Sequence, residues 1–269
     1  MKLHYFKPPD GTSNFGDELN VHIWKHFLPN FFDDNDNLVF FGIGTILRAA
    51  KKYYPNSEII VFGAGAHGVD QKPNLNFQTI FVRGPLSSAL LNNAKFITDP
   101  AILTPIVFPF NNPIKKHSYS YIPHFSVANH SYKRAVERLG INYIDPRNSV
   151  ESIIEDINAS KVLICEAMHG AIVADAYRIP WIPVSSFKSF NNFKWKDWSQ
   201  SLSLSIEINK LHRLYNHSSL KESIKNKLFV FQLKKILKTK PYLSDIKVSA
   251  VAKEKILEEV SLFKEKYSN

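Results

Sequence analysis

The stretch Lys161-Val-Leu-Ile-Cys165-Glu-Ala-Met-His169-Gly170-Ala-Ile-Val-Ala-Asp175-Ala decides the fold class of this chain. Its apolar run up to Cys165 predicts a β-strand that is covered on both faces, as strands of parallel sheets are. A helical pattern begins at Gly170, only four residues after the strand. A strand that leads directly into a helix is the repeating unit of parallel α/β folds, so we expect an α/β protein.

The same alternation continues outward in both directions. Predicted strands span residues 38–42, 58–63, 78–83, 118–123, 161–165 and 181–184. Predicted helices begin at Asp17, Thr45, Leu86, Ser131, Val150 and Gly170. A proline-rich break at residues 104–113 divides this series near its middle. We therefore predict two Rossmann-like halves, residues 1–110 and 111–204, in a glycosyltransferase-B-like architecture, followed by a basic helical tail at residues 205–269.

The composition is that of a packed globular protein, with 44% hydrophobic and 22% charged residues among 269. Cys165 is the single cysteine, which excludes an intrachain disulfide, and its apolar neighbours favour a buried, inert thiol. The first nine residues lack the apolar core of a signal peptide, and no apolar run is long enough to span a bilayer. We expect a cytoplasmic protein.

The net charge of +10 is concentrated in the tail, where residues 205–269 hold 14 Lys and Arg against 7 Asp and Glu. Basic segments of this kind contact nucleic acid or an anionic membrane surface, or simply form a solvated helix face. No nucleic-acid-binding motif is present, so nucleic acid is not an expected partner. Peripheral membrane contact and packing on the rest of the protein both remain open for a predicted apolar helix face made of Leu220, Ile224, Leu228 and Phe231.

Gly63-Ala-Gly65-Ala-His-Gly68 has the spacing of a dinucleotide-binding loop and follows a predicted strand. That fingerprint also requires an immediate helix and an acidic residue at the end of the next strand. Here residues 69–76 have the composition of a loop, and the next predicted strand ends in Arg83. Nicotinamide binding is therefore disfavoured, and we predict a strand-end turn that lets the backbone approach a ligand or another strand.

Val82-Arg83-Gly84-Pro85 joins a predicted strand to a predicted helix. Proline suits the first turn of a helix, so the Arg83 guanidinium is expected beside a helix N-terminus at the carboxyl edge of a sheet. Both features favour an anion, and arginine offers two parallel hydrogen bonds to a carboxylate or phosphate. Arg83 is therefore a candidate anion-binding residue, and a surface arginine in an ordinary turn is the alternative.

His169 is expected to open a helix at the carboxyl end of a strand, where open α/β sheets bind their ligands. Gly170 removes a side chain that would block close approach. A histidine in this position binds an anion when it is charged and transfers a proton near neutral pH. A capping or packed histidine is the alternative.

Weaker signals lie elsewhere in the chain. Asp17 follows a glycine at a helix start, where N-capping is the alternative to a functional role. His124 ends a predicted strand and is expected at the same sheet edge as His169. The histidines and carboxylates show no metal-ligand spacing, so no metal is expected. Three lysines stand among aromatic residues in a stretch predicted to be a sugar-facing or solvated loop, namely Lys188, Lys194 and Lys196.

Taken together and in this order, these motifs resemble the polysaccharide pyruvyltransferase family over about residues 12–200. The string from Glu166 to Asp175 is most similar to the succinoglycan-type ketal pyruvyltransferases. The matching motifs are Asn14-Phe-Gly-Asp17-Glu-Leu-Asn20, Val82-Arg83-Gly84-Pro85, Asp99-Pro100, Ile122-Pro-His124 and Met168-His169-Gly170.

The resemblance implies that phosphoenolpyruvate donates a pyruvyl group to a sugar of a surface-polysaccharide precursor, free or lipid-linked, and that the product is a cyclic ketal. Such a reaction requires acid–base work and electrostatic stabilisation but no redox cofactor, so no cofactor is expected. The donor carries a carboxylate and a phosphate, which require cations and helix N-termini in a small pocket.

The resemblance implies donor binding by Arg83 and His169, and we add the neighbouring Gly84 and Gly170. We assign catalysis to His169, with Asp17 and His124 as further candidates for acid–base work or acceptor binding. Some family members also carry an arginine two residues before the histidine. That position is Ala167 here, so another cation must help to hold the donor.

Two other functions fit the same residues. A glycosyltransferase that uses a nucleotide-activated sugar, including a sugar derived from a 2-keto acid, would bind its anionic donor with the same sheet-edge cations. A non-catalytic scaffold of polysaccharide assembly would use the basic tail for docking. Donor binding separates the first from a pyruvyltransferase, and replacement of His169 separates the second.

Overall fold

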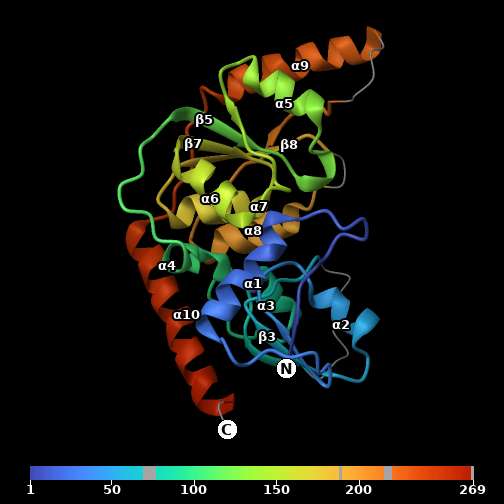
Figure 1. Ribbon diagram of the computed structural model, residues 1–269, viewed down its shortest axis with the longest axis vertical. Helices are drawn as coiled ribbons and strands as arrows, with labels where there is room; N and C mark the ends of the chain where they lie inside the picture. Colours follow the sequence, from blue (N-terminus) through green and yellow to red (C-terminus); the bar gives the residue numbers. More distant parts are fainter. Residues whose placement is uncertain (69–76, 188–189, 215–219, 268–269) are drawn as a thin grey trace.

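The computed structural model describes residues 1–68, 77–187, 190–214 and 220–267, and these residues form two α/β halves (Figure 1). The first half holds a parallel sheet in the order β1-β2-β3-β4, and the second holds a parallel sheet in the order β6-β5-β7-β8-β9. The α/β prediction is therefore confirmed. The strands are β1 (Lys2–His4), β2 (Leu38–Phe41), β3 (Glu58–Phe62), β4 (Phe77–Phe81), β5 (His117–Ile122), β6 (Asn142–Tyr143), β7 (Ser160–Cys165), β8 (Trp181–Ser185) and β9 (Asn209–Lys210).

All six predicted strands are present, as β2, β3, β4, β5, β7 and β8. The unpredicted strands β1, β6 and β9 are two or three residues long and lie at sheet edges, where no buried apolar run is needed. Because β9 pairs with β8, strand structure continues slightly beyond residue 205, where the sequence predicted that it would stop.

Both faces of each sheet are covered, which explains the unbroken apolar runs. In β2, Phe40 points into a large core shared by the two halves, whereas Val39 and Phe41 point into a separate core under the outer helices. The alternation follows directly from the two-residue period of a strand. The shared core runs from the first sheet through the middle helices to the second sheet, and it joins the halves into one packed body.

The helices of the described residues are α1 (Phe15–Phe27), α2 (Leu47–Tyr53), α3 (Pro85–Leu90), α4 (Thr104–Val107), α5 (His130–Glu137), α6 (Val150–Asn158), α7 (Met168–Ala176), α8 (Asn192–Ser201), α9 (Leu220–Ile236) and α10 (Ile246–Tyr267). The six predicted helices are all present and begin within two residues of their predicted starts. The proline-rich break begins as α4, directly after the buried 3-10 turn Pro100–Leu103, so its first residues are packed rather than extended.

The stretch predicted as a lysine-rich loop is instead mostly helix α8. Its two tryptophans, Trp195 and Trp198, are fully buried and their rings lie against Trp181 of β8. The predicted loop covered residues 187–198, and the prediction is wrong for residues 192–198, because the aromatic residues recur at helical spacing and face the core. Lys188 lies outside the described residues.

The two C-terminal helices pack against both halves, α9 on the second and α10 on the first (Figure 1). Helix α9 packs on the outer face of the second sheet through Phe229, Leu233 and Ile236. Helix α10 then returns along the first half, where the Phe263 ring lies 5.6 Å from that of Phe40 and 5.4 Å from that of Phe62. Within the described residues, no helix combines the length and apolarity needed to cross a membrane.

The strand order of the second half has a switch point, which is where open α/β sheets usually bind ligands. The chain runs from β5 outward to β6 and then returns to β7 on the other side of β5. Loops therefore leave the carboxyl ends of β5 and β7 in opposite directions and open a crevice between them. Residues after these two strands, including His124 and His169, are the ones that this topology brings to the crevice.

Candidate functional site

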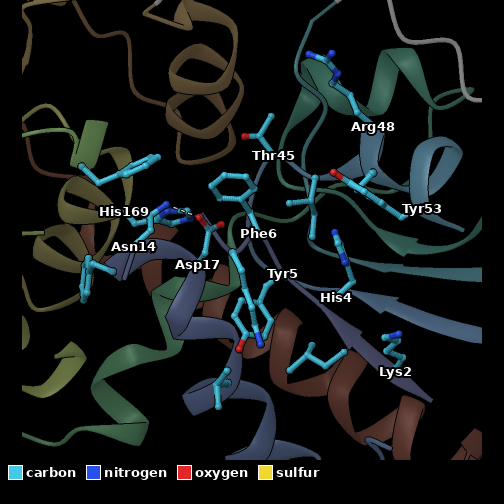
Figure 2. A pocket seen from close by; sticks show the side chains of 18 of the residues that line it. Lys2, His4, Tyr5, Phe6, Asn14, Asp17, Thr45, Arg48, Tyr53 and His169 are labelled. Atoms are coloured by element: carbon cyan, nitrogen blue, oxygen red, sulfur yellow. Dashed lines mark hydrogen bonds between the residues drawn. The ribbon is translucent and has the colours of Figure 1, made fainter. Parts of the chain in front are cut away.

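A cavity of about 1440 Å³ lies between the two halves, and Figure 2 shows it from close by. Its walls include residues that follow the carboxyl ends of six strands, namely β1, β2, β3, β5, β6 and β7, together with residues of α1, α2 and α8. Carboxyl ends of parallel strands are where α/β proteins bind ligands. Its polar lining includes Asp17, which is buried, and His169 and Lys194, which are partly buried.

His169 lies in the first turn of α7 and is 15% exposed. Its ring lies against the backbone of Gly16 in α1, where a Cβ atom would come within 1.9 Å of Nδ1. Glycine is therefore required at position 16 for the imidazole to take its place. This contact gives a physical reason for the glycine that precedes Asp17 in the sequence motif.

Asp99 faces the other side of the same imidazole. Its fully buried carboxylate holds the Ala101 amide through Oδ1 and points Oδ2 at His169 Nε2, at 3.6 Å. Neither of these two facing atoms has a hydrogen-bond partner among the described residues. The carboxylate faces the ring and orients it, the same arrangement by which buried acids position catalytic histidines.

Asp17 lies in the first turn of α1 and is 8% exposed. It accepts a hydrogen bond from the side chain of Asn14, which occupies the N-cap position, so the capping role considered for Asp17 is wrong. Burial raises the pKa of Asp17 to about 6, although His169, Lys194 and Asn14 all act in the opposite direction. A carboxyl group with a pKa near neutrality suits proton transfer.

Lys194 extends from the first turn of α8 into the same cavity. A cation in the first turn opposes the helix dipole, and burial together with the charge of Arg83 lowers the pKa of Lys194 to about 8. It forms no ion pair with any carboxylate in the described part of the chain. The cavity therefore contains a desolvated cation that an anionic ligand would stabilise.

His124 also lines the cavity, directly after β5. Its Nδ1 accepts a hydrogen bond from the Ser126 backbone amide, at 3.3 Å, and its ring lies between those of Phe125 and Phe187. Burial and the nearby Lys194 lower the pKa of His124 to about 3. The side chain is therefore neutral at ordinary pH and can donate a hydrogen bond, but it cannot serve as a cation.

Arg83 is fully buried behind the cavity wall. Its Nε donates to Asp197 of α8 at 3.1 Å, and the same carboxylate accepts the Ser87 amide in the first turn of α3 at 2.8 Å. The sequence predicted an anion at this guanidinium and helix N-terminus, and in the structure that anion is a side chain of the protein. Among the described hydrogen-bond partners of Arg83, Thr45 is the one that lines the cavity, and its hydroxyl accepts a hydrogen bond from Nη1 at 2.9 Å.

The glycines of the predicted donor site allow other parts of the protein to pack closely against their backbone. A Cβ atom on Gly84 would come within 1.9 Å of the Asp197 carbonyl oxygen, and one on Gly170 within 2.9 Å of Ile122. Neither lines the cavity. Gly65 of the dinucleotide-like loop lies against the Arg83 guanidinium, where a Cβ would come within 2.2 Å. This is the close backbone approach that the sequence suggested, and its partner is another part of the protein.

The structure thus brings together Asp17, His124 and His169 and keeps Arg83 behind them. Two residues of the site were not assigned a functional role from the sequence. Asp99, which lies behind His169, was noted as a turn residue and as part of a family motif, and the cavity residue Lys194 was noted only as part of a loop. Among the residues that the structure describes, no three His, Cys, Asp or Glu side chains gather as metal ligands would.

The fold and the site define an α/β protein with a cavity between two parallel sheets that is lined by a histidine, a carboxylic acid and a lysine. Residues 14–188 match the family model for polysaccharide pyruvyl transferases, and the chain belongs to this family. It is 35% identical over 207 residues to the succinoglycan biosynthesis protein ExoV of Rhizobium meliloti (strain 1021), an alignment that covers 75% of this chain and 65% of that protein.

Proposed function

We propose that this protein transfers a pyruvyl group from phosphoenolpyruvate to a sugar of a polysaccharide precursor and forms a cyclic ketal. One observation carries the proposal. An unpaired lysine, a histidine and a raised-pKa carboxylic acid meet at the uncapped N-terminus of α7, inside the cavity of a polysaccharide pyruvyl transferase family member. We also assign the two halves to a glycosyltransferase-B-like architecture, with the cavity between them as the cleft.

The donor anions would occupy the space between α7 and Lys194. Helix α7 begins without a capping side chain, and its first residues Ala167, Met168 and His169 line the cavity. Free amides at a helix start attract phosphate or carboxylate. Lys194 supplies the cation that Ala167 does not provide at the position where some relatives have arginine.

Arg83 would support this site indirectly. It holds α8, and therefore Lys194, through its ion pair with Asp197, and it orients the Thr45 hydroxyl at the cavity wall. We therefore assign Arg83 a positioning role in donor binding, and assign Gly84 and Gly170 the role of letting α8 and α7 approach closely enough.

The chemistry needs two hydroxyl groups of one sugar. The first attacks C2 of phosphoenolpyruvate while the methylene carbon receives a proton and becomes a methyl group. The second then attacks C2 as the bond from C2 to the phosphate oxygen breaks. Two carbon–oxygen bonds form, one breaks, and the two hydroxyl protons end on the methyl group and on the released phosphate.

Asp17 and His169 are suited to move these protons. Asp17 would accept the proton of the attacking hydroxyl, because its pKa of about 6 makes it a base at neutral pH that can also return a proton. His169 keeps Nε2 toward Asp99, which leaves Nδ1 for the donor phosphate or for proton transfer. His124, being neutral, would donate a hydrogen bond to the acceptor.

The remaining part of the cavity suits a sugar chain. Its volume exceeds the usual size of a small-molecule pocket, which is about 300–1,000 Å³. Phe6 and Tyr53 line it and are 42% and 57% exposed, so aromatic faces are open to a ligand (Figure 2). Such faces stack on the apolar faces of sugar rings, and we assign this part of the cavity to the acceptor.

The deciding experiment incubates the protein with phosphoenolpyruvate and a panel of aryl and lipid-linked glycosides. The expected product gains the mass of pyruvic acid minus one water, and one phosphate is released for each product. The His169→Ala variant should lose transfer by about 10²–10⁴-fold while its circular dichroism stays unchanged. Stabilisation by nucleotide sugars but not by phosphoenolpyruvate would assign the cavity to a glycosyltransferase instead.

A further inference from the structure

Helix α9 has two apolar faces, and only one of them is covered. Phe229, Leu233 and Ile236 pack on the second sheet. The residues on the opposite side follow the spacing i, i+4, i+7 and remain in solvent, where Ile224 is 59%, Leu228 40% and Phe231 55% exposed. Exposed apolar side chains in a continuous stripe mark a contact surface more often than scattered ones do.

Basic side chains flank this stripe. The exposed lysines Lys227, Lys234 and Lys235 lie on the same helix, and the ammonium of Lys235 is 4.5 Å from the centre of the Phe231 ring. Lys238 and Lys240 follow the end of the helix and are exposed as well. Apolar residues and lysines on one face are typical of helices that lie in the headgroup region of a membrane.

Helix α5 lies beside α9 and extends the basic surface, as the two helices at the upper end of Figure 1 show. It adds the exposed side chains of Arg134 and Arg138. Glu137 is the sole acidic side chain that the structure describes on these two helices, and it forms an ion pair with Lys133 at 3.9 Å. The charge of this end of the molecule is therefore strongly positive.

Helix α10 provides the contrast within the same tail. Its outer face also exposes apolar residues, with Val251 at 47% and Leu262 at 52%. These two are interspersed with the exposed acids Glu254, Glu258 and Glu265 as well as with lysines. Such a mixture of acidic and basic side chains is typical of an ordinary solvated helix face.

We propose that the surface formed by α5 and the outer face of α9 docks on an anionic lipid bilayer. Ile224, Leu228 and Phe231 enter the boundary between headgroups and acyl chains, and the surrounding lysines and arginines contact the phosphates. The attachment is peripheral and reversible, because it combines a short apolar stripe with screened charges. It does not depend on the proposed reaction, although it would carry the cavity to a lipid-linked acceptor.

The test is co-sedimentation of the full chain with vesicles of phosphatidylcholine alone or with phosphatidylglycerol, at low and at high salt. We expect binding only to the phosphatidylglycerol vesicles, weakened by salt. Neutralising Lys234, Lys235, Lys238 and Lys240 to Gln should weaken binding more than tenfold, since each basic residue near the surface is worth about fivefold in partitioning. The pair Ile224→Ser and Phe231→Ser should weaken it at least tenfold even at low salt.

Matched variants on α10 provide the control. Changing Lys247, Lys255, Lys264 and Lys266 to Gln removes the same charge, and Val251→Ser with Leu262→Ser removes similar apolar surface. Both should leave vesicle binding within twofold of the parent protein. Circular dichroism of every variant confirms that it is folded.

Several results would overturn the proposal. These are absence of binding to phosphatidylglycerol vesicles at low salt, and an equal loss of binding in the α10 variants. A third is concentration-dependent dimerisation that the α9 serine variants abolish, which would make the stripe an interface between two copies. A fourth is binding to duplex RNA that needs the lysines but not Ile224 and Phe231. None of these results bears on transfer measured with soluble acceptors, so the two proposals can fail separately.

Discussion

Two neighbouring regions of the molecule differ in whether their buried charges form an ion pair. Arg83 is paired with Asp197, and the same carboxylate also holds the start of α3. Lys194 lies only three residues before Asp197 on α8, yet it faces the cavity without a described ion pair. Its neighbour Asp17 is also buried, with a raised pKa.

The difference separates a structural role from a functional one. A buried ion pair whose hydrogen bonds are satisfied holds two elements in register. Desolvated charges that lack partners destabilise the free protein, and they regain favourable interactions when a ligand of suitable charge arrives. The first pair therefore fixes α8 against the first half, and the second set is the one that the proposed donor would stabilise.

The largest effect is expected when the ion pair between Arg83 and Asp197 is broken. Arg83→Ala leaves the Asp197 carboxylate buried without its cation and should lower the free energy of unfolding by about 3–5 kcal/mol. Urea denaturation measures this. Arg147→Ala is the control, because Arg147 forms a comparable pair with Asp145 at the surface, at 2.6 Å, and its loss should cost under about 1 kcal/mol. Equal effects of the two substitutions would show that the Arg83 pair does not fix α8.

The second prediction is a substitution that should raise the free energy of unfolding, whereas Arg83→Ala should lower it. Because the pKa of Asp17 is raised to about 6 in the folded protein, folding is disfavoured progressively as the pH rises from about 4 through 6. Asp17→Asn should therefore stabilise the protein by about 1–3 kcal/mol at pH 7, with the gain vanishing near pH 4. Urea denaturation at both pH values tests this, and transfer activity should be lost in parallel. A destabilised Asp17→Asn protein at pH 7 would contradict the assignment.

The third prediction concerns the unpaired cation. The folded-state pKa of Lys194 is lowered to about 8, so its charged form is disfavoured by folding below that pH. Lys194→Met should raise the free energy of unfolding at pH 7 by about 1–2 kcal/mol and weaken phosphoenolpyruvate binding by about 10–100-fold. Calorimetry measures the affinity. Lys196→Met is the control, because Lys196 is exposed on the same helix.

The smallest effect is a change in the shape of the pH profile. Activity should rise as Asp17 ionises through about pH 6 and fall as Lys194 loses its proton through about pH 8. Lys194→Arg should remove the fall on the alkaline side, since arginine stays charged, while retaining part of the activity. A decline near pH 8 that survives this substitution would place the alkaline group elsewhere.

Most of the fold was predictable because short stretches of sequence determine its strands and helices. Strands such as β3 and β7 carry apolar residues on both faces, and turn residues separate them from helices with clear periodicity. Helix α8 was missed because Lys196 and Asp197 separate its two tryptophans and conceal the helical spacing. Its buried face becomes apparent only when Trp181 is placed against it.

The site was predictable only in part, because its partners are distant in sequence. His169 and His124 were found from strand-end motifs and Asp17 from a helix-start motif, and all three line the cavity. The physical reasoning that Arg83 requires an anion was sound, but Asp197 lies 114 residues away and no local pattern connects the two. Asp99 likewise carries an ordinary turn signal, and its relation to His169 exists only in the folded chain.

Two glycines at and behind the cavity wall have a consequence for how the family can diverge. Gly16 and Gly65 each occupy a place where a single added carbon would collide with the side chain of His169 or Arg83. Each glycine thus leaves the space that one larger side chain from elsewhere in the chain occupies. A lineage that loses the side chain is released from the constraint on its glycine, so the two positions should drift together. Relatives that have lost His169 should be the ones in which position 16 has become free to vary.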